Sequence, residues 1–302
     1  MSGRPIPRWL GIVLLLVIAA VFGSNHVAAR LAFEHGANVS TAVAFRSTGT
    51  ALFVLALLAW SGVPLRVDRG TLARAIVIGL FLAVQSFCLY SAVARIPVAL
   101  ALLAFQTFPM LLSLISWAAG GERPSRRVRF AMPVALLGLA LALGVWDGSG
   151  APWQGFTGRW AEMGAGVLWA TGASVSFALV LFLTTRWLGA VDGRLRSFFI
   201  MSVVALVTIA GAAAADDFAL PADATGWLGL ALLTVFYGSA ITSMFVLLPR
   251  LGAVNNAAVL NFEPIAVLGL AWAVLGQAVA PLQVAGAFIV VGAIVWLGTG
   301  RA

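Results

Sequence analysis

The chain is poor in charge and contains no lysine. Only 9% of its 302 residues are charged, while 62% are hydrophobic. Soluble globular domains normally carry about 25% charged residues, because their surface must be solvated. The composition therefore excludes an ordinary soluble domain and predicts a protein whose surroundings are the lipid bilayer.

Cysteine is almost absent, and the sequence patterns of catalytic and metal sites are missing. The single Cys88 excludes an intrachain disulfide and a cysteine-rich metal site. The sequence has no Walker A loop, no HExxH motif, no paired carboxylates and no Gly-x-Ser-x-Gly elbow. It therefore predicts no enzyme, no metal and no cofactor, and it excludes ATP hydrolysis within this chain.

Long apolar runs dominate what is present. A hydrocarbon core of roughly 30 Å requires about 20 apolar residues per helix. These runs are too long and too uniformly apolar for the alternating strands of a membrane barrel. The chain is therefore predicted to be an all-α, polytopic membrane protein with ten transmembrane helices, at residues 9–29, 39–60, 71–93, 98–119, 128–146, 162–184, 195–215, 225–248, 253–275 and 280–299.

The net charge of +8 predicts orientation rather than nucleic-acid binding. All 18 basic residues are arginine, and 14 of them fall on the cytoplasmic side if the N-terminus is inside. Asp216, Asp217 and Asp223 gather in one outer loop. By the positive-inside rule, both termini are expected in the cytoplasm. The first apolar run is expected to stay as a helix, since its cleavage as a signal peptide would leave an odd number of helices.

An internal repeat divides the chain. A shift of 155 residues superimposes the fourth predicted helix on the ninth, so that Pro109 meets Pro264 and Trp117 meets Trp272. Two halves of five helices follow, residues 1–150 and 151–302. Because five is odd, corresponding helices cross in opposite directions, which predicts an inverted repeat around a central cavity. Secondary transporters commonly use such repeats, although a duplicated scaffold without transport is the alternative.

The two repeated prolines are candidate hinges. Pro109 and Pro264 each remove a helical hydrogen bond, and Pro109 leaves the carbonyl group of Phe105 without its usual partner. Broken backbone at membrane depth is tolerated chiefly where protein or a water-filled cavity covers it. Residues 106–109 and 261–264 are therefore predicted to line a cavity, although proline-kinked helices are also common as plain structure.

Glu263 is the only acid that lies deep in a predicted helix. An ionised side chain there costs at least ~3 kcal/mol unless it is paired or solvated. Three roles stay open: proton coupling, a structural ion pair with Arg46, the only deeply placed arginine, and contact with a substrate amine. His26 is a second candidate for coupling, but a lone membrane histidine more often bonds to a neighbouring helix.

Other polar and aromatic side chains near mid-helix are candidates for substrate binding. An aromatic-lined cavity suits an apolar or aromatic solute, or a cation held over ring faces, better than a sugar phosphate. Ser86 lies among these positions. The candidates are Ser24, Asn25, Gln85, Tyr90, Gln106, Phe108, Trp169, Tyr237, Ser243, Asn261 and Phe262. Five glycines are expected to be helix-packing contacts instead: Gly79, Gly138, Gly144, Gly286 and Gly292.

The stretch Asn261-Phe262-Glu263-Pro264-Ile265, followed by Trp272 and Gly276-Gln277, resembles the EamA branch of the drug/metabolite transporter superfamily. The resemblance spans nearly the whole chain. It departs where Gln277 replaces the family's usual Glu, and where Phe108 replaces a Glu often found before the first proline. The chain is most similar to YddG-type aromatic amino-acid exporters of bacterial inner membranes, which implies a basket-like bundle with Trp169 and Phe108 at two aromatic positions of that group.

Residues and resemblance together predict a secondary exporter of amino acids, aromatic or large apolar, or of related small metabolites, working by alternating access. Protons are a candidate coupling ion. The carboxylate of an amphipathic zwitterion needs hydrogen-bond donors, which Gln85, Gln106, Asn261 and Tyr237 would supply. The alternative is a multidrug or quaternary-ammonium extruder, because an acid in aromatic surroundings also fits a lipophilic cation. A structural or sensory protein is disfavoured by the lack of a soluble module.

Overall fold

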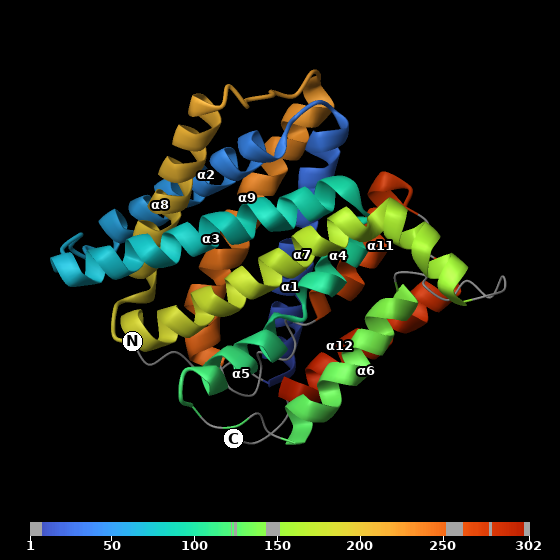
Figure 1. The fold of residues 1–302 in the computed structure, drawn as a ribbon. Helices are drawn as coiled ribbons and strands as arrows, with labels where there is room; N and C mark the ends of the chain where they lie inside the picture. Colours follow the sequence, from blue (N-terminus) through green and yellow to red (C-terminus); the bar gives the residue numbers. More distant parts are fainter. Residues whose placement is uncertain are drawn as a thin grey trace.

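The computed structural model describes residues 8–121, 123, 126–142, 152–251, 262–277 and 280–298. Every regular element within these ranges is a helix, as Figure 1 shows, so the all-α class is confirmed for the described residues. The helices are α1 (Arg8–Glu34), α2 (Val39–Trp60), α3 (Arg69–Arg95), α4 (Val98–Phe105), α5 (Phe108–Ala118), α6 (Arg126–Ala142), α7 (Pro152–Leu188), α8 (Gly193–Ala214), α9 (Ala224–Leu251), α11 (Glu263–Leu275) and α12 (Pro281–Gly298).

Six described segments are long and apolar enough to cross a membrane, namely Val13–Glu34, Val39–Trp60, Arg69–Arg95, Val98–Ala118, Met163–Leu188 and Gly193–Ala214. Four shorter apolar segments accompany them, namely Arg129–Ala142, Ala224–Ala240, Glu263–Leu275 and Pro281–Ala293. These segments follow the order of the predicted helices, and six of them are long enough to span the bilayer. Part of the expected helix at 253–275 lies outside the described residues.

The fourth predicted span agrees with the apolar segment Val98–Ala118, and its helix is interrupted at residues 106–107, next to the predicted proline break. α4 ends at Phe105 and α5 begins at Phe108, with Pro109 in the first turn of α5. A proline at that position loses no intrahelical hydrogen bond and has a backbone angle suited to starting a helix. Pro264 likewise lies in the first turn of α11. Both prolines therefore lie where a helix starts. Residues 106–107 connect the end of α4 to the start of α5.

The helices pack in pairs that are related by exchanging the two halves of the chain. α1 packs along α9 and α3 along α7, while α2 packs along α8 and α6 along α12. If the first predicted span is matched with the sixth, the second with the seventh and so on, the α1–α9 pair maps onto the α7–α3 pair. The α2–α8 and α6–α12 pairs map onto themselves. Figure 1 shows α6 and α12 lying side by side.

Small residues allow the closest of these approaches. A Cβ atom added at Gly286 of α12 would lie 2.5 Å from the carbonyl oxygen of Gly138 in α6. A Cβ atom at Gly79 of α3 would lie 2.6 Å from the Val203 side chain in α8. The expected packing roles of these three glycines are confirmed. Gly292 faces open space, so its expected contact is wrong, and Gly144 lies outside the described residues.

Candidate functional site

Polar side chains from five helices meet in the interior. This polar cluster comprises Asn25 and His26 of α1, Arg46 of α2, Gln85, Ser86 and Tyr90 of α3, Tyr237 of α9 and Glu263 of α11. Seven of the eight are positions that the sequence predicts for substrate binding or coupling. The eighth, Ser86, lies next to Gln85. Because polar groups at membrane depth are costly, their convergence in one place marks the region as a candidate site.

Arg46 is the buried cation of the polar cluster. Its side chain is almost fully enclosed, with 3% of the residue exposed. The Nη2 atom donates to Ser86 Oγ at 2.7 Å, and Ser86 Oγ in turn donates to Gln85 Oε1 at 3.3 Å. The guanidinium carbon lies 4.1 Å from the ring centre of Tyr237 and 5.1 Å from that of Tyr90. Among the described residues Arg46 is thus surrounded by neutral hydroxyl, amide and ring groups.

Glu263 lies at the other end of the cluster. It occupies the first turn of α11, where the positive end of the helix dipole favours a carboxylate. Its Oε1 atom is 3.5 Å from His26 Nε2, and the His26 ring centre is 5.7 Å from that of Tyr90. Tyr90 donates its hydroxyl hydrogen to Asn25 Oδ1 at 2.8 Å. Tyr90 therefore contacts Arg46 at one end of the cluster and, at the other end, the histidine that lies next to Glu263.

The partner of Glu263 differs from the one that a sequence hypothesis proposes. One hypothesis from the sequence pairs Glu263 with Arg46, but in the structure the carboxylate of Glu263 lies next to His26. Of the six buried side-chain atoms that have no hydrogen-bond partner in the described part of the chain, two belong to the polar cluster, Arg46 Nε and His26 Nδ1. An unsatisfied buried donor or acceptor is costly, so these atoms mark places where a ligand would gain binding energy.

Several other candidates fall outside the polar cluster. Ser24 donates to the Ala20 carbonyl oxygen of its own helix at 2.8 Å. Gln106 is buried at the junction of α4 and α5, and Ser243 is half-buried in α9. Phe262 is 38% exposed at the start of α11. Asn261 lies outside the described residues.

The chain break before Pro109 is closed by protein. Ser174 of α7 donates to the Phe105 carbonyl oxygen at 2.7 Å, which satisfies a group at the end of α4, where carbonyl groups have no partner within the helix. The Phe108 ring packs against Phe177 of α7, with ring centres 4.9 Å apart. This break is therefore a helix-packing junction. Sequence reasoning missed Ser174, because a lone serine in an apolar helix does not reveal which carbonyl group it faces.

Gln277, which replaces the Glu of the resembling family, has a local structural role. Its Oε1 atom accepts a hydrogen bond from the backbone N–H of Val98 at 3.2 Å. Val98 is the first residue of α4, where backbone N–H groups have no partner within the helix. The side chain of Gln277 thus caps α4 from the end of α11.

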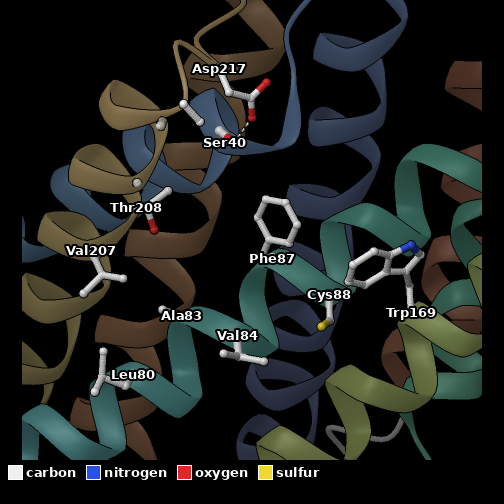
Figure 2. Close-up of a pocket in the computed structure, with 13 residues that line it drawn as sticks. Ser40, Leu80, Ala83, Val84, Phe87, Cys88, Trp169, Val207, Thr208 and Asp217 are labelled. Carbon is white, nitrogen blue, oxygen red and sulfur yellow. Dashed lines mark hydrogen bonds between the residues drawn. The ribbon is translucent and has the colours of Figure 1, made fainter.

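A cavity of about 500 Å³ lies between α3, α7 and α8 (Figure 2), and none of its lining residues belongs to the polar cluster. Figure 2 shows Leu80, Val84 and Phe87 along its apolar wall, with Trp169 at one side. Ser40 donates to Asp217 Oδ2 at 2.6 Å at its polar end. We refer to it as the α3–α8 groove; Trp169 is the predicted site residue that lines it. Its apolar lining gave no sequence signal, since such residues are ordinary on a membrane helix.

The α8–α9 connection is tied to the α1–α2 connection. Asp217 accepts a hydrogen bond from Asn38 Nδ2 at 2.8 Å, and Asp223 Oδ2 lies 2.7 Å from His35 Nδ1. The pKa of the Asp223 carboxyl lies below its ordinary value, chiefly because the Gly226 backbone N–H donates to it and secondly because of His35. These contacts join segments of the two sequence halves at one end of the bundle.

Comparison with known proteins assigns the chain to a family. The model of the EamA-like transporter family matches residues 9–144 and again residues 164–299. A search of curated proteins finds no match. A solved crystal structure is similar over 95% of this chain and 96% of its own, with a TM-score of 0.64 and 19% identity, which shows a shared fold alone. The chain is therefore a membrane protein that belongs to the EamA-like transporter family.

Proposed function

We propose that this transporter exports amino acids, aromatic or large apolar ones, or closely related small metabolites, through a bacterial inner membrane. Ten spans form two inverted halves, residues 1–150 and 151–302, with both termini in the cytoplasm. Alternating access between these halves moves the solute. Family membership supports transport of a small solute, and the chemistry of the polar cluster supports the choice of solute.

The repeated architecture is supported by two independent features. The family model matches each half of the chain separately. The helix pairs α1–α9 and α7–α3 exchange when the halves are exchanged, while α2–α8 and α6–α12 are preserved. Two similar halves in opposite orientation have equivalent inward and outward arrangements, which is the basis of alternating access in other inverted-repeat transporters.

The observation that carries the proposed substrate is the coexistence of a buried cation, a carboxylate and two tyrosine rings in one cluster. Arg46, Glu263, Tyr90 and Tyr237 all belong to it. Ionisable groups at membrane depth are expensive and characteristically mark substrate or ion pathways. Charges of both signs beside aromatic surfaces suit a solute that is itself dipolar and partly apolar.

Counterflow into proteoliposomes tests this function. Vesicles containing purified protein are preloaded with unlabelled solute, and uptake of labelled phenylalanine, threonine and a lipophilic cation is followed separately. We expect accumulation of phenylalanine above protein-free vesicles. If the cation alone is exchanged, amino-acid export is refuted and the extruder function takes its place.

Extrusion of lipophilic cations is the second candidate, and the α3–α8 groove favours it. Its walls are apolar and aromatic, with Phe87 and Trp169 in contact at a ring distance of 6.0 Å. Asp217 supplies a carboxylate at its polar end. A quaternary ammonium ion with apolar substituents matches that combination, because ring faces attract cations.

Proton coupling is proposed through Glu263 and His26, which are titratable and lie 3.5 Å apart. Glu263→Gln removes the proton-accepting carboxylate while keeping the side-chain size. We expect this variant still to exchange solute in counterflow at saturating solute concentration, because binding is weakened and not abolished, but to lose uptake driven by an imposed pH gradient. Transport that keeps its full rate and pH dependence would exclude the coupling role.

A further inference from the structure

The polar cluster contains two opposite charges that protein contacts satisfy only in part. Arg46 is buried, its guanidinium meets one hydroxyl group and two ring faces, and its Nε atom lacks a partner. A buried ion is stabilised only when a counter-charge and hydrogen bonds replace its water. Among the described residues, no carboxylate forms an ion pair with Arg46. An anionic group of a ligand could therefore supply the missing counter-charge.

The carboxylate of Glu263, of opposite charge, also has few protein partners. This carboxylate is 3.5 Å from His26 Nε2, beyond the usual 2.7–3.2 Å of a nitrogen–oxygen hydrogen bond. The Glu263 side chain is 21% exposed, so protein does not enclose it completely. A carboxylate that keeps unused acceptor positions beside aromatic rings is a fitting partner for an ammonium group.

The two ends are joined by aromatic rings. Tyr90 lies 5.1 Å from the Arg46 guanidinium and 5.7 Å from the His26 ring, and His26 contacts Glu263. The ring centre of Tyr237 lies 4.1 Å from the Arg46 guanidinium carbon. A solute that lies along this line meets a positive end, an aromatic surface and a negative end in sequence.

We propose that Arg46 binds the carboxylate and Glu263 the ammonium group of one α-amino acid, whose side chain packs against Tyr237. This assignment rests on the proposed amino-acid transport and deepens it, because it makes the neutral zwitterion the preferred substrate class. A simple amine leaves Arg46 unpaired, and a simple carboxylic acid leaves Glu263 unpaired. Discrimination against both arises from the charge left buried without a partner.

Three ligands of nearly the same shape test the assignment. Phenylalanine carries both charges, phenethylamine lacks the carboxylate, and 3-phenylpropionate lacks the ammonium group. Their dissociation constants are measured on the purified full chain by competition with labelled phenylalanine and, independently, by calorimetric titration. For the unmodified protein we expect phenylalanine to bind at least about tenfold more tightly than either analogue, which corresponds to about 1.4 kcal/mol.

The variants should then give a crossed pattern. Arg46→Gln is expected to weaken phenylalanine at least about tenfold while leaving phenethylamine unchanged or tighter. Glu263→Gln is expected to weaken phenylalanine similarly while leaving 3-phenylpropionate unchanged or tighter. Two control variants remove the same charges elsewhere, Arg194→Gln and Glu34→Gln, whose side chains are paired at the protein surface. The controls should not alter any of the three constants.

The possible failures are distinguishable. If the unmodified protein neither binds nor exchanges phenylalanine, the proposed function fails and this assignment falls with it. If phenylalanine is exchanged but Arg46→Gln and Glu263→Gln weaken all three ligands equally, both residues act only on the fold, and the assignment is overturned while amino-acid transport stands. Unfolded variants are recognised by size-exclusion profile, and Arg46→Lys, which retains the charge, is then expected to retain the preference for phenylalanine over phenethylamine.

Discussion

Replacing Gly286 by alanine is expected to separate α6 from α12. The new Cβ atom would lie 2.4 Å from the backbone nitrogen of Ala142 and 2.5 Å from the carbonyl oxygen of Gly138, whereas ordinary contacts are 3.4 Å or longer. The helices must therefore move apart by about 1 Å, because backbone atoms cannot rotate away as side chains do. Overpacking of this kind costs about 1–3 kcal/mol.

The free energy of unfolding is measured by titrating the purified protein with dodecyl sulfate in mixed micelles. Gly292→Ala is the matched control on the same helix, since a Cβ atom there meets nothing within 4 Å. The control should stay within about 0.5 kcal/mol of the unmodified protein. Small residues let the backbones of membrane helices approach closely, and Gly286 is expected to do so here. Equal free energies of unfolding for Gly286→Ala and Gly292→Ala would refute this role.

Three further predictions concern single contacts. Ser174→Ala should lower the free energy of unfolding by about 1–3 kcal/mol, because it leaves a buried carbonyl group unpaired, whereas Thr171→Ala on an exposed face of α7 should change it little. Gln277→Ala should cost about 0.5–2 kcal/mol in the same assay through loss of the cap on α4, and Gln277→Glu should retain the cap. Because the folded-state pKa of Asp223 lies below 3.8, its ties are intact above that pH and are lost as pH falls through the lower value. The apparent melting temperature should therefore drop in acid more steeply for the unmodified protein than for Asp223→Asn.

Helix positions were predictable because bilayer thickness fixes the length of an apolar run. The prediction at 39–60 coincides with α2, which Asn38 caps through its side chain. The prediction at 162–184 agrees with the apolar span Met163–Leu188, whereas the helix α7 itself already begins at Pro152. A proline at the first turn favours a helix start. Apolar periodicity alone did not reveal that extension.

The candidate site was predictable in its members and less so in its contacts. Arg46 and Glu263 stand out in the sequence because charge is rare and costly at membrane depth. Their partners depend on how each helix is rotated against its neighbours, which local sequence does not encode. For that reason Glu263 meets His26 instead of Arg46, and Ser174 was not foreseen as the partner of Phe105.

Thiol accessibility tests the central claim, that a solute reaches the polar cluster. The chain's single cysteine is replaced in a Cys88→Ala background, and Gln85→Cys then places one reactive thiol beside Ser86 and Arg46. We expect a membrane-impermeant maleimide to label this thiol in vesicles, and phenylalanine at saturating concentration to slow the labelling. No labelling from either side of the membrane, or labelling at the same rate with and without phenylalanine, would contradict the account.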